Sequence, residues 1–264
     1  CAFYRDRADP DAYVLPWERI STKIRELVDA GGTQVLLQGG HNPALKIDYF
    51  EDLFRRIKAE FPVHLHALSP SEITYISRIS RLDIDTTLAR LKEAGLASIP
   101  GGGAEILSDR VREIISPRKI SSDEWIGVMR RAHLAGIPSS STMMFGSVET
   151  HEVIVEHLTR LRKLQDETGG FTAFIPWSYQ PVSGSLDRDE ATALDYLRIA
   201  AFSRVYLDNI PNIQSSWVTQ GPKIGQVALF FGVNDMGGTL YYENITRCPF
   251  VSHKRSANAT RRNA

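Results

Sequence analysis

Short apolar runs alternate with amphipathic stretches along most of this chain, and this alternation constrains the fold more than any other feature. The apolar runs predict β-strands at 33–38, 63–68, 97–100, 139–145, 171–176 and 213–217, with a weaker one at 232–234. Strands that alternate with helices at this spacing run parallel and are joined by crossover helices. No dinucleotide-binding glycine fingerprint follows the first strand, which disfavours a doubly wound sheet. We therefore expect an α/β fold, a (β/α) barrel of the TIM type, truncated before or within its first strand.

Several helix boundaries can be read from capping patterns. Asp48 followed by Glu51, and Ser121 followed by Glu124, have the spacing of a capping box, in which two side chains bond the free amides at a helix N-terminus. Gly136 is placed to end the second of these helices, because glycine readily adopts the left-handed conformation that closes a helix. We predict a helix behind each box.

Composition narrows the functional classes. The chain has 264 residues with 31 basic and 31 acidic side chains, and this balance argues against nucleic acid as the main partner. No apolar run reaches the roughly 18–20 residues of a membrane span. The two cysteines, Cys1 and Cys248, cannot build a disulfide framework, so a reducing, cytoplasmic location is expected. We predict one domain over 1–246, followed by a basic, disordered tail over 247–264.

Glycine and polar residues gather at the predicted C-terminal ends of the strands, where barrels of this kind carry their active sites. Clusters of this composition occupy 38–40, 64–70, 100–105, 142–146 and 176–181. A single glycine pair would be explained by a tight turn between a strand and a helix. Five clusters at one end of the strands instead favour a ligand that contacts bare backbone groups.

The titratable residues in these clusters leave alternatives open. His64 and His66 share one face of a strand and could bind a metal, as in a metal-dependent hydrolase. Beyond Asp235 the further ligands that such a site needs are missing, so a polar barrel interior that holds a ligand is favoured. Glu105 could accept hydrogen bonds from ribose hydroxyls or favour a helix N-terminus. Glu149 is interpreted as structural.

The longer motifs resemble a known family. The segments are Cys-Ala-Phe-Tyr-Arg at 1–5, Leu-Gln-Gly-Gly at 37–40, His-Leu-His-Ala-Leu-Ser-Pro at 64–70, Ile-Pro-Gly-Gly-Gly-Ala-Glu-Ile-Leu at 99–107, Thr-Met-Met-Phe-Gly at 142–146 and Gln-Asp-Glu-Thr-Gly-Gly-Phe-Thr-Ala-Phe-Ile-Pro-Trp at 165–177. They resemble the radical S-adenosylmethionine (SAM) enzymes of the futalosine route to menaquinone. The similarity covers the chain from Cys1 to about Glu243 and is greatest to the cyclase branch, which acts on dehypoxanthine futalosine.

This resemblance implies a 4Fe-4S cluster and SAM as cofactors. Three cysteines of a C-x3-C-x2-C loop would hold the cluster, and Cys1 matches the third of them. The cluster would cleave SAM to a 5′-deoxyadenosyl radical that abstracts hydrogen from the ribose of the substrate, and the carbon radical would close a spirocyclic ring. A reductant such as flavodoxin or ferredoxin would supply the electron. A closed barrel suits this chemistry because it shields a radical from water.

The resemblance also implies roles for individual residues. Gln38-Gly39-Gly40 stands where family members bind the methionyl amino group through backbone, although the commoner form there is Gly-Gly-Glu. The remaining cofactor residues would be Tyr4 beside the adenosyl group, Glu105 at the ribose, and Thr142, Met143 and Gly146 at the adenine. The expected substrate residues are His66, Ser69, Trp177, Gln180, Gln214 and Trp217.

Some features depart from the family. The two upstream cysteines are not in the sequence, and the tail from Arg247 is basic where the family continues with small apolar residues. We therefore expect the chain as given not to hold a stable cluster. Aminofutalosine synthases share the 101–106 and 165–171 motifs, and deazaflavin-cofactor synthases share the Gln-Gly-Gly and His-Ala segments, but Ser69-Pro70 and the 217–223 segment are similar to the cyclases. A ligand-binding protein without catalytic activity remains a further alternative.

Overall fold

The computed structural model describes residues 5, 9–10, 12–181, 186 and 188–239. Cys1, Tyr4 and the predicted tail over 247–264 lie outside these residues. The strands are β1 (Gln34–Leu37), β2 (His64–Ala67), β3 (Ser139–Phe145), β4 (Phe171–Ser178) and β5 (Asn212–Ile213). The helices are α1 (Trp17–Asp29), α2 (Ile47–Glu60), α3 (Pro70–Ser80), α4 (Ile84–Ala94), α5 (Asp109–Ile115), α6 (Ser122–Leu134), α7 (His151–Thr168), α8 (Ala193–Tyr206), α9 (Trp217–Gln220), α10 (Pro222–Ala228) and the 3-10 helix η2 (Leu229–Phe231).

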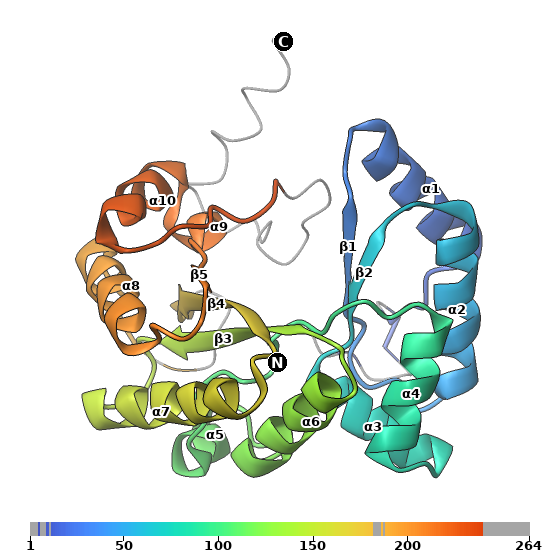
Figure 1. Ribbon diagram of the computed structural model, residues 1–264, viewed down its shortest axis with the longest axis horizontal. Helices are drawn as coiled ribbons and strands as arrows, with labels where there is room; N and C mark the ends of the chain where they lie inside the picture. The colour runs from blue at the N-terminus through green and yellow to red at the C-terminus, as the bar shows by residue number, and fades with distance from the viewer. Residues whose placement is uncertain (1–4, 6–8, 11, 182–185, 187, 240–264) are drawn as a thin grey trace.

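In the described part of the chain, the strand pairs are all parallel and follow chain order, as the alternating pattern predicts. One sheet joins β1 to β2 and a second joins β3, β4 and β5. The 97–99 segment connects the two, because Ser98 bridges to His66 and Ile99 bridges to Ser139. Within the described residues the strands form an open arc, with the helices packed on its outside (Figure 1).

The observed strands are mostly shorter than the predicted ones. β3 has the predicted bounds and β4 runs two residues further than expected, to Ser178. The prediction at 97–100 gives only isolated bridges, and the weak prediction at 232–234 is replaced by a bridge between Gln214 and Asp235. The strand expected over 213–217 ends at Ile213, and Trp217 instead begins a helix.

The two predicted capping boxes have different outcomes. The Ser121 box is confirmed, since Ser121 and Glu124 bond each other's backbone amides at the start of α6. The box at Asp48 is wrong, because α2 already begins at Ile47 and lacks a side-chain cap. Asp48 and Glu51 instead bind the guanidinium of Arg90 in α4.

Side chains alternate between the two faces of each strand. Leu65, Met143, Phe174 and Ile213 point toward the helices and are fully buried in one continuous hydrophobic core. The opposite face carries mostly polar side chains. We call this the inner face and define it by Gln34, Leu36, Gln38, His64, His66, Ser98, Ser140, Thr142, Met144, Ile175, Trp177 and Gln214.

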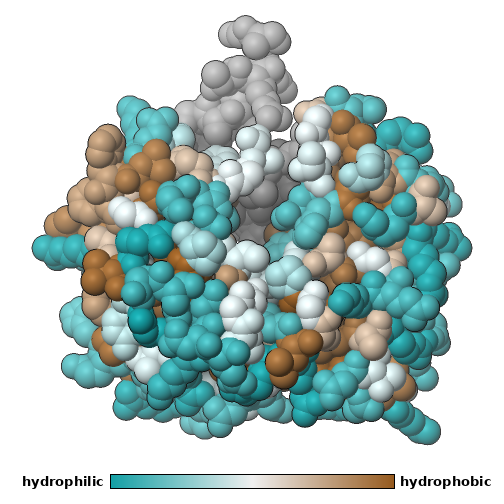
Figure 2. Space-filling model, viewed as in Figure 1, coloured by the Kyte–Doolittle hydropathy of each residue, from teal (hydrophilic) through white to brown (hydrophobic). Residues whose placement is uncertain are grey.

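The outer surface is largely hydrophilic on the face seen in Figure 2, with apolar residues over α8 and α10 at its left. Among the described residues, no helix combines the length and the apolar composition that a bilayer span needs.

Candidate functional site

A chain of hydrogen bonds crosses the inner face from β2 to β3. The hydroxyl of Ser98 lies 2.7 Å from Nε2 of His64 and 2.6 Å from Nδ1 of His66. On its other side, Nε2 of His66 makes a long contact of 3.5 Å with Oγ of Ser140. One hydroxyl hydrogen cannot be donated to both imidazoles, so Ser98 accepts a hydrogen bond from at least one of the two rings. The two histidines therefore have coupled tautomers.

His66 is uncharged at neutral pH. Burial, and to a lesser degree the neighbouring His64, lower the pKa of His66 from 6.5 to about 4. An uncharged imidazole can both donate and accept a hydrogen bond. His66 is thus suited to orient a ligand that carries hydroxyl or carbonyl groups.

The loop after β1 is fixed by a buried carboxylate. Oε1 of Glu72 accepts hydrogen bonds from the amides of Gly39 at 2.8 Å and Gly40 at 2.9 Å. Oε2 of Glu72 accepts two more, from the amide and the hydroxyl of Ser69. An ammonium ligand donates hydrogen bonds, so its backbone partners here would be carbonyls rather than the amides that Glu72 already binds.

The triple glycine opens a tightly placed loop over 101–107. A Cβ on Gly101 would lie 2.6 Å from the Cα of Ser141, so only glycine fits against β3. A Cβ on Gly102 would lie 2.6 Å from the side-chain amide of Gln38. This contact places the end of β1 directly beside the glycine loop.

Glu105 occupies an unusual backbone conformation within this loop. Its φ is 44°, a value that residues other than glycine seldom adopt. Its carbonyl accepts a 2.7 Å hydrogen bond from the amide of Met144 in β3. Its carboxylate forms an ion pair with Lys119. The predicted ribose ligand is therefore held on a strained backbone and next to a cation.

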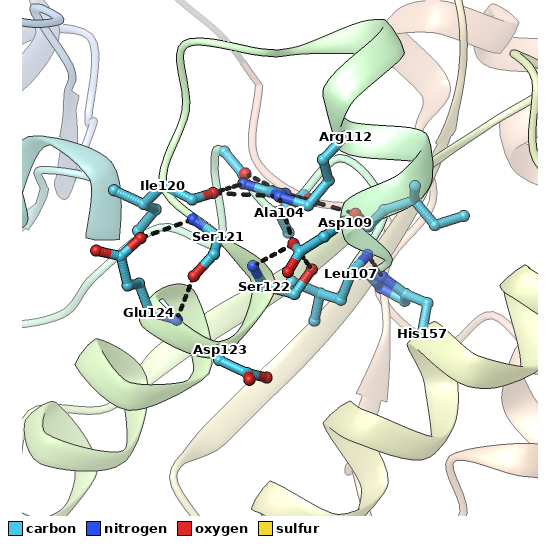
Figure 3. A network of polar contacts seen from close by, with 12 residues as sticks. Ala104, Leu107, Asp109, Arg112, Ile120, Ser121, Ser122, Asp123, Glu124 and His157 are labelled. Atoms are coloured by element: carbon cyan, nitrogen blue, oxygen red, sulfur yellow. Dashed lines mark hydrogen bonds and ion pairs between the residues drawn. The ribbon is translucent and has the colours of Figure 1, made fainter.

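Arg112 of α5 lies behind the loop and is only 3% exposed. Its guanidinium donates to the carbonyls of Gly103 at 3.1 Å, Ala104 at 2.5 Å and Ile120 at 3.2 Å (Figure 3). Burial lowers the pKa of Arg112, while the Glu105 and Asp109 carboxylates act in the opposite direction.

The residues predicted to meet the adenine separate in the structure. The hydroxyl of Thr142 lies on the inner face and donates to the carbonyl of Gly101 at 2.7 Å. Met143 points away from that face and is fully buried in the hydrophobic core, so the structure does not place its side chain at the site. Gly146 has a φ of 82°, and its amide donates to Glu149. Glu149 also bonds Ser147, which agrees with the structural interpretation of this carboxylate.

The predicted substrate residues also divide. Trp177 in β4 is paired with Met144 in β3. Gln214 follows β5, and its backbone amide donates a hydrogen bond to the carbonyl of Phe174 in β4. Both therefore lie on the inner face with His66. The side chains of the other three predicted residues have partners of their own. The hydroxyl of Ser69 is taken up by the α3 cap, the amide of Gln180 bonds the backbone and hydroxyl of Ser178, and Trp217 packs over Gly225.

The metal-hydrolase alternative finds no support in this geometry. His64 and His66 both bond Ser98 rather than converging on a vacant point. Among the residues that the structure describes, no group of three or more His, Cys, Asp or Glu lies close enough to share a metal ion.

Sequence reasoning missed four residues that organise the site. Glu72 had a readable signal, because Ser69 and Glu72 have the same capping-box spacing as Ser121 and Glu124. Arg112, Lys119 and Ser98 had none. Their partners lie in other segments, and residue spacing alone does not reveal such contacts.

Two family models match the chain. The Radical SAM superfamily model covers residues 1–161, and the model of the CofH/MqnC C-terminal region covers residues 168–263. Together they span both halves of the strand arc and the segment that carries the glycine loop.

Two curated proteins that are similar to this chain are named for different reactions. The chain is 45% identical to a cyclic dehypoxanthine futalosine synthase of Halalkalibacterium halodurans, over 98% of this chain and 70% of that protein. It is also 45% identical to a 5-amino-6-(D-ribitylamino)uracil–L-tyrosine 4-hydroxyphenyl transferase of Methanothermobacter thermautotrophicus, over 96% of this chain and 71% of that protein. Identity alone does not separate these two reactions.

The fold has a solved counterpart. A crystal structure of methylornithine synthase (PylB) superposes with a TM-score of 0.68 at 17% identity, over 95% of this chain and 72% of that one. The agreement supports a TIM-like α/β fold. The chain belongs to the radical SAM superfamily and, within it, to the group that carries the CofH/MqnC C-terminal region.

Proposed function

We propose that this chain is the barrel of a radical SAM cyclase that converts dehypoxanthine futalosine into its cyclic form in menaquinone biosynthesis. The observation that carries the proposal is 45% identity to a cyclic dehypoxanthine futalosine synthase along 98% of the chain. Ser69-Pro70 and the 217–223 segment, which are similar to the cyclases, favour the same reaction.

The glycine loop suits the nucleoside part of SAM. Gly101 and Gly102 leave bare backbone beside Gln38, and Glu105 presents a carboxylate that can accept hydrogen bonds from two ribose hydroxyls. Cys1, the proposed cluster ligand, lies outside the described residues. When bound, SAM and a 4Fe-4S cluster supply a one-electron cleavage that initiates radical chemistry. The role of the chain is to hold the nucleoside in one orientation.

The inner face suits an aromatic nucleoside as substrate. Trp177 offers apolar surface for a benzoate ring, while uncharged His66 and Gln214 offer hydrogen bonds to ribose hydroxyls and carbonyl groups. Ser98 fixes the orientation of the His66 ring. Together these groups orient the ribose and the benzoate ring of the substrate, so that the ribose carbon that loses hydrogen faces the adenosyl group of SAM.

The proposed reaction needs an electron donor and a place for the substrate. A flavodoxin or ferredoxin in the cytoplasm would serve as the electron donor. The substrate would lie on the inner face of the strand arc.

A second candidate function is the 4-hydroxyphenyl transferase reaction. It is favoured by 45% identity to the Methanothermobacter thermautotrophicus transferase along 96% of the chain. Such an enzyme would use 5-amino-6-(D-ribitylamino)uracil and tyrosine in place of one nucleoside substrate.

A substrate test separates the two. The purified protein is extended at its N-terminus so that Cys1 completes a C-x3-C-x2-C loop, and it is reconstituted anaerobically with iron, sulfide and a reductant. It is then incubated with SAM and either dehypoxanthine futalosine or 5-amino-6-(D-ribitylamino)uracil plus tyrosine. Mass spectrometry then measures 5′-deoxyadenosine and the substrate-derived product. We expect a product that is two hydrogens lighter than dehypoxanthine futalosine, formed together with 5′-deoxyadenosine.

The matched control is Glu105→Gln, which should lower 5′-deoxyadenosine formation with either substrate. Product from the uracil and tyrosine alone would overturn the cyclase assignment in favour of the transferase. If neither substrate gives product or extra 5′-deoxyadenosine, both candidate functions are wrong.

A further inference from the structure

Arg112 is a buried cation without a carboxylate at hydrogen-bond distance among the described residues. The carboxylate of Asp109 is 3.8 Å from Nε of Arg112 and instead accepts two hydrogen bonds of 2.7 Å from Ser122. Removing a guanidinium from water costs several kcal/mol, and carbonyl partners offset that only when their geometry is good. A side chain of this kind contributes more to a specific local conformation than to stability.

The carbonyls that Arg112 binds lie on both sides of Glu105. Nη1 donates to Gly103, Ala104 and, at 3.5 Å, to Ile106. Gly103 has a φ of 78° and Glu105 a φ of 44°, so the backbone turns sharply between these contacts. A left-handed glutamate persists only where its surroundings enforce it. The guanidinium provides that constraint, because its planar fork binds several carbonyls at once.

The same guanidinium also binds the segment that carries Lys119, the cation of the Glu105 ion pair. Nε and Nη2 of Arg112 both donate to the carbonyl of Ile120, the residue after Lys119. Figure 3 shows Arg112 between the Ala104 and Ile120 backbones. One buried side chain therefore sets the position of Glu105 and of the cation that faces it.

Other elements brace the ends of the loop, whereas its middle is bound by Arg112 and by the Met144 amide of β3, which donates to the Glu105 carbonyl. Nδ1 of His157 in α7 accepts a 2.9 Å hydrogen bond from the amide of Leu107. The indole of Trp125 in α6 donates a 3.2 Å hydrogen bond to the carbonyl of Gly102. Neither contact involves residues 103–106. Changes at Arg112 should therefore act on the Glu105 segment specifically.

We propose that Arg112 is a positioning residue that pre-organises Glu105 to bind the ribose hydroxyls of the adenosyl cofactor. The inference rests on the proposed function, in which Glu105 contacts that ribose. Arg112 itself touches no ligand, and it acts through the carbonyls of Gly103, Ala104 and Ile106.

The test measures the part of nucleoside affinity that the ribose hydroxyls contribute. Calorimetry on the full chain gives Kd for 5′-deoxyadenosine and for 2′,3′,5′-trideoxyadenosine, and their ratio is the hydroxyl contribution. For Arg112→Lys we expect that ratio to fall by about tenfold, because a lysine ammonium cannot bridge the carbonyls on both sides of Glu105. The affinity for trideoxyadenosine should stay unchanged. Arg131→Lys, a surface arginine paired with Asp85, is the matched control and should keep the wild-type ratio.

A double-mutant comparison separates positioning from a general structural role. In a Glu105→Gln background, Arg112→Lys should cause no further loss of the hydroxyl contribution. An equal loss of affinity for both nucleosides, or a further loss in that background, would overturn the role of Arg112. Wild-type protein that binds neither nucleoside, or binds both equally, would overturn the proposed cofactor site and this inference with it.

Hydrogen exchange provides a second measurement if Arg112→Lys does not fold. In ligand-free wild-type protein, the backbone amides of 104–107 should exchange much more slowly than in an unfolded chain. Exchange at the unfolded rate until nucleoside is added would show that the ligand, and not Arg112, orders the loop.

Discussion

The carboxylate of Glu72 accepts a 2.8 Å hydrogen bond from the amide of Gly39, which connects the first helical turn of α3 to the end of β1. The two residues are 33 positions apart in the sequence. This contact converts an ordinary helix cap into a clamp on the loop where the methionyl part of the cofactor is expected. It also explains why that loop can use glycines without losing its shape.

Glu72→Gln should destabilise the protein by about 2–4 kcal/mol, because the new amide group donates where Glu72 accepted from buried backbone amides. Urea unfolding measures the loss, and hydrogen exchange at Gly39 and Gly40 should become faster. Glu124→Gln is the control, since Glu124 forms an equivalent but exposed cap without a long-range bond. That variant should cost at most about 1 kcal/mol. Equal losses in both variants would show that the clamp contributes nothing beyond the cap.

Gly101→Ala should destabilise the protein by about 2–4 kcal/mol, because its Cβ would lie 2.6 Å from the backbone of Ser141 and neither segment can move freely. Gly127→Ala is the opposite case. An added Cβ there has nothing within 4 Å, so the substitution in α6 should stabilise by about 0.5–1 kcal/mol. Thermal unfolding of both variants decides the point. A stable Gly101→Ala protein would mean that the loop does not pack against β3 as described.

Ser98→Ala should weaken substrate binding, because the imidazole of His66 loses the hydroxyl that orients it. We expect the Km for dehypoxanthine futalosine to rise about tenfold, while Kd for 5′-deoxyadenosine stays unchanged. The stability loss should be about 1–2 kcal/mol.

Ser203→Ala in α8 is the control for that variant. Ser203 is fully buried and its hydroxyl has no partner within the described part of the chain, so its loss should change stability by less than about 0.5 kcal/mol. A rise in Km of similar size in both variants would exclude a specific role for Ser98.

Acid should destabilise the protein through its buried histidines. Burial lowers the pKa of His133 to about 4 and that of His157 to about 3, whereas both have a pKa near 6.5 when unfolded. Below pH 6.5 the unfolded chain therefore binds more protons than the folded one. Each histidine then removes up to about 1.4 kcal/mol of unfolding free energy per pH unit, and this contribution is fully retained above pH 6.5.

The measurement is urea unfolding at pH 7.5, 6.5 and 5.5. His157→Gln keeps an acceptor for the Leu107 amide. In this variant the unfolding free energy should fall less steeply between pH 6.5 and 5.5, because one of the two buried histidines no longer contributes. An unchanged slope in that variant would show that His157 is not buried in its neutral form.

Strand prediction succeeded for β3, which is buried on both faces. Six of the seven residues of β3 are buried, and its predicted bounds are the observed ones. It failed at 213–217, because the Ser215 amide bonds the carbonyl of Asp235 and the chain then turns into α9. The sequence Ser-Ser-Trp at 215–217 is compatible both with the end of a strand and with the start of a helix, so the sequence pattern does not distinguish the two.

The arrangement of the candidate site was predictable only in part. Three of the predicted substrate residues, His66, Trp177 and Gln214, lie on the inner face, and their role in binding stays a prediction. Met143 was misplaced, because residues one position apart on a strand face opposite sides, and the motif alone does not give the register.

The alternation of strands and helices, the glycine-rich strand ends and the motifs of the radical SAM superfamily can all be read from the amino-acid sequence. Each of these depends on local spacing, which is fixed by helix and strand geometry. The tertiary structure decided which buried polar groups satisfy one another: Glu72 with Gly39, Arg112 with the carbonyls around Glu105, and Ser98 with two histidines. A polar side chain removed from water must find a partner, but its identity depends on segments brought together only by folding.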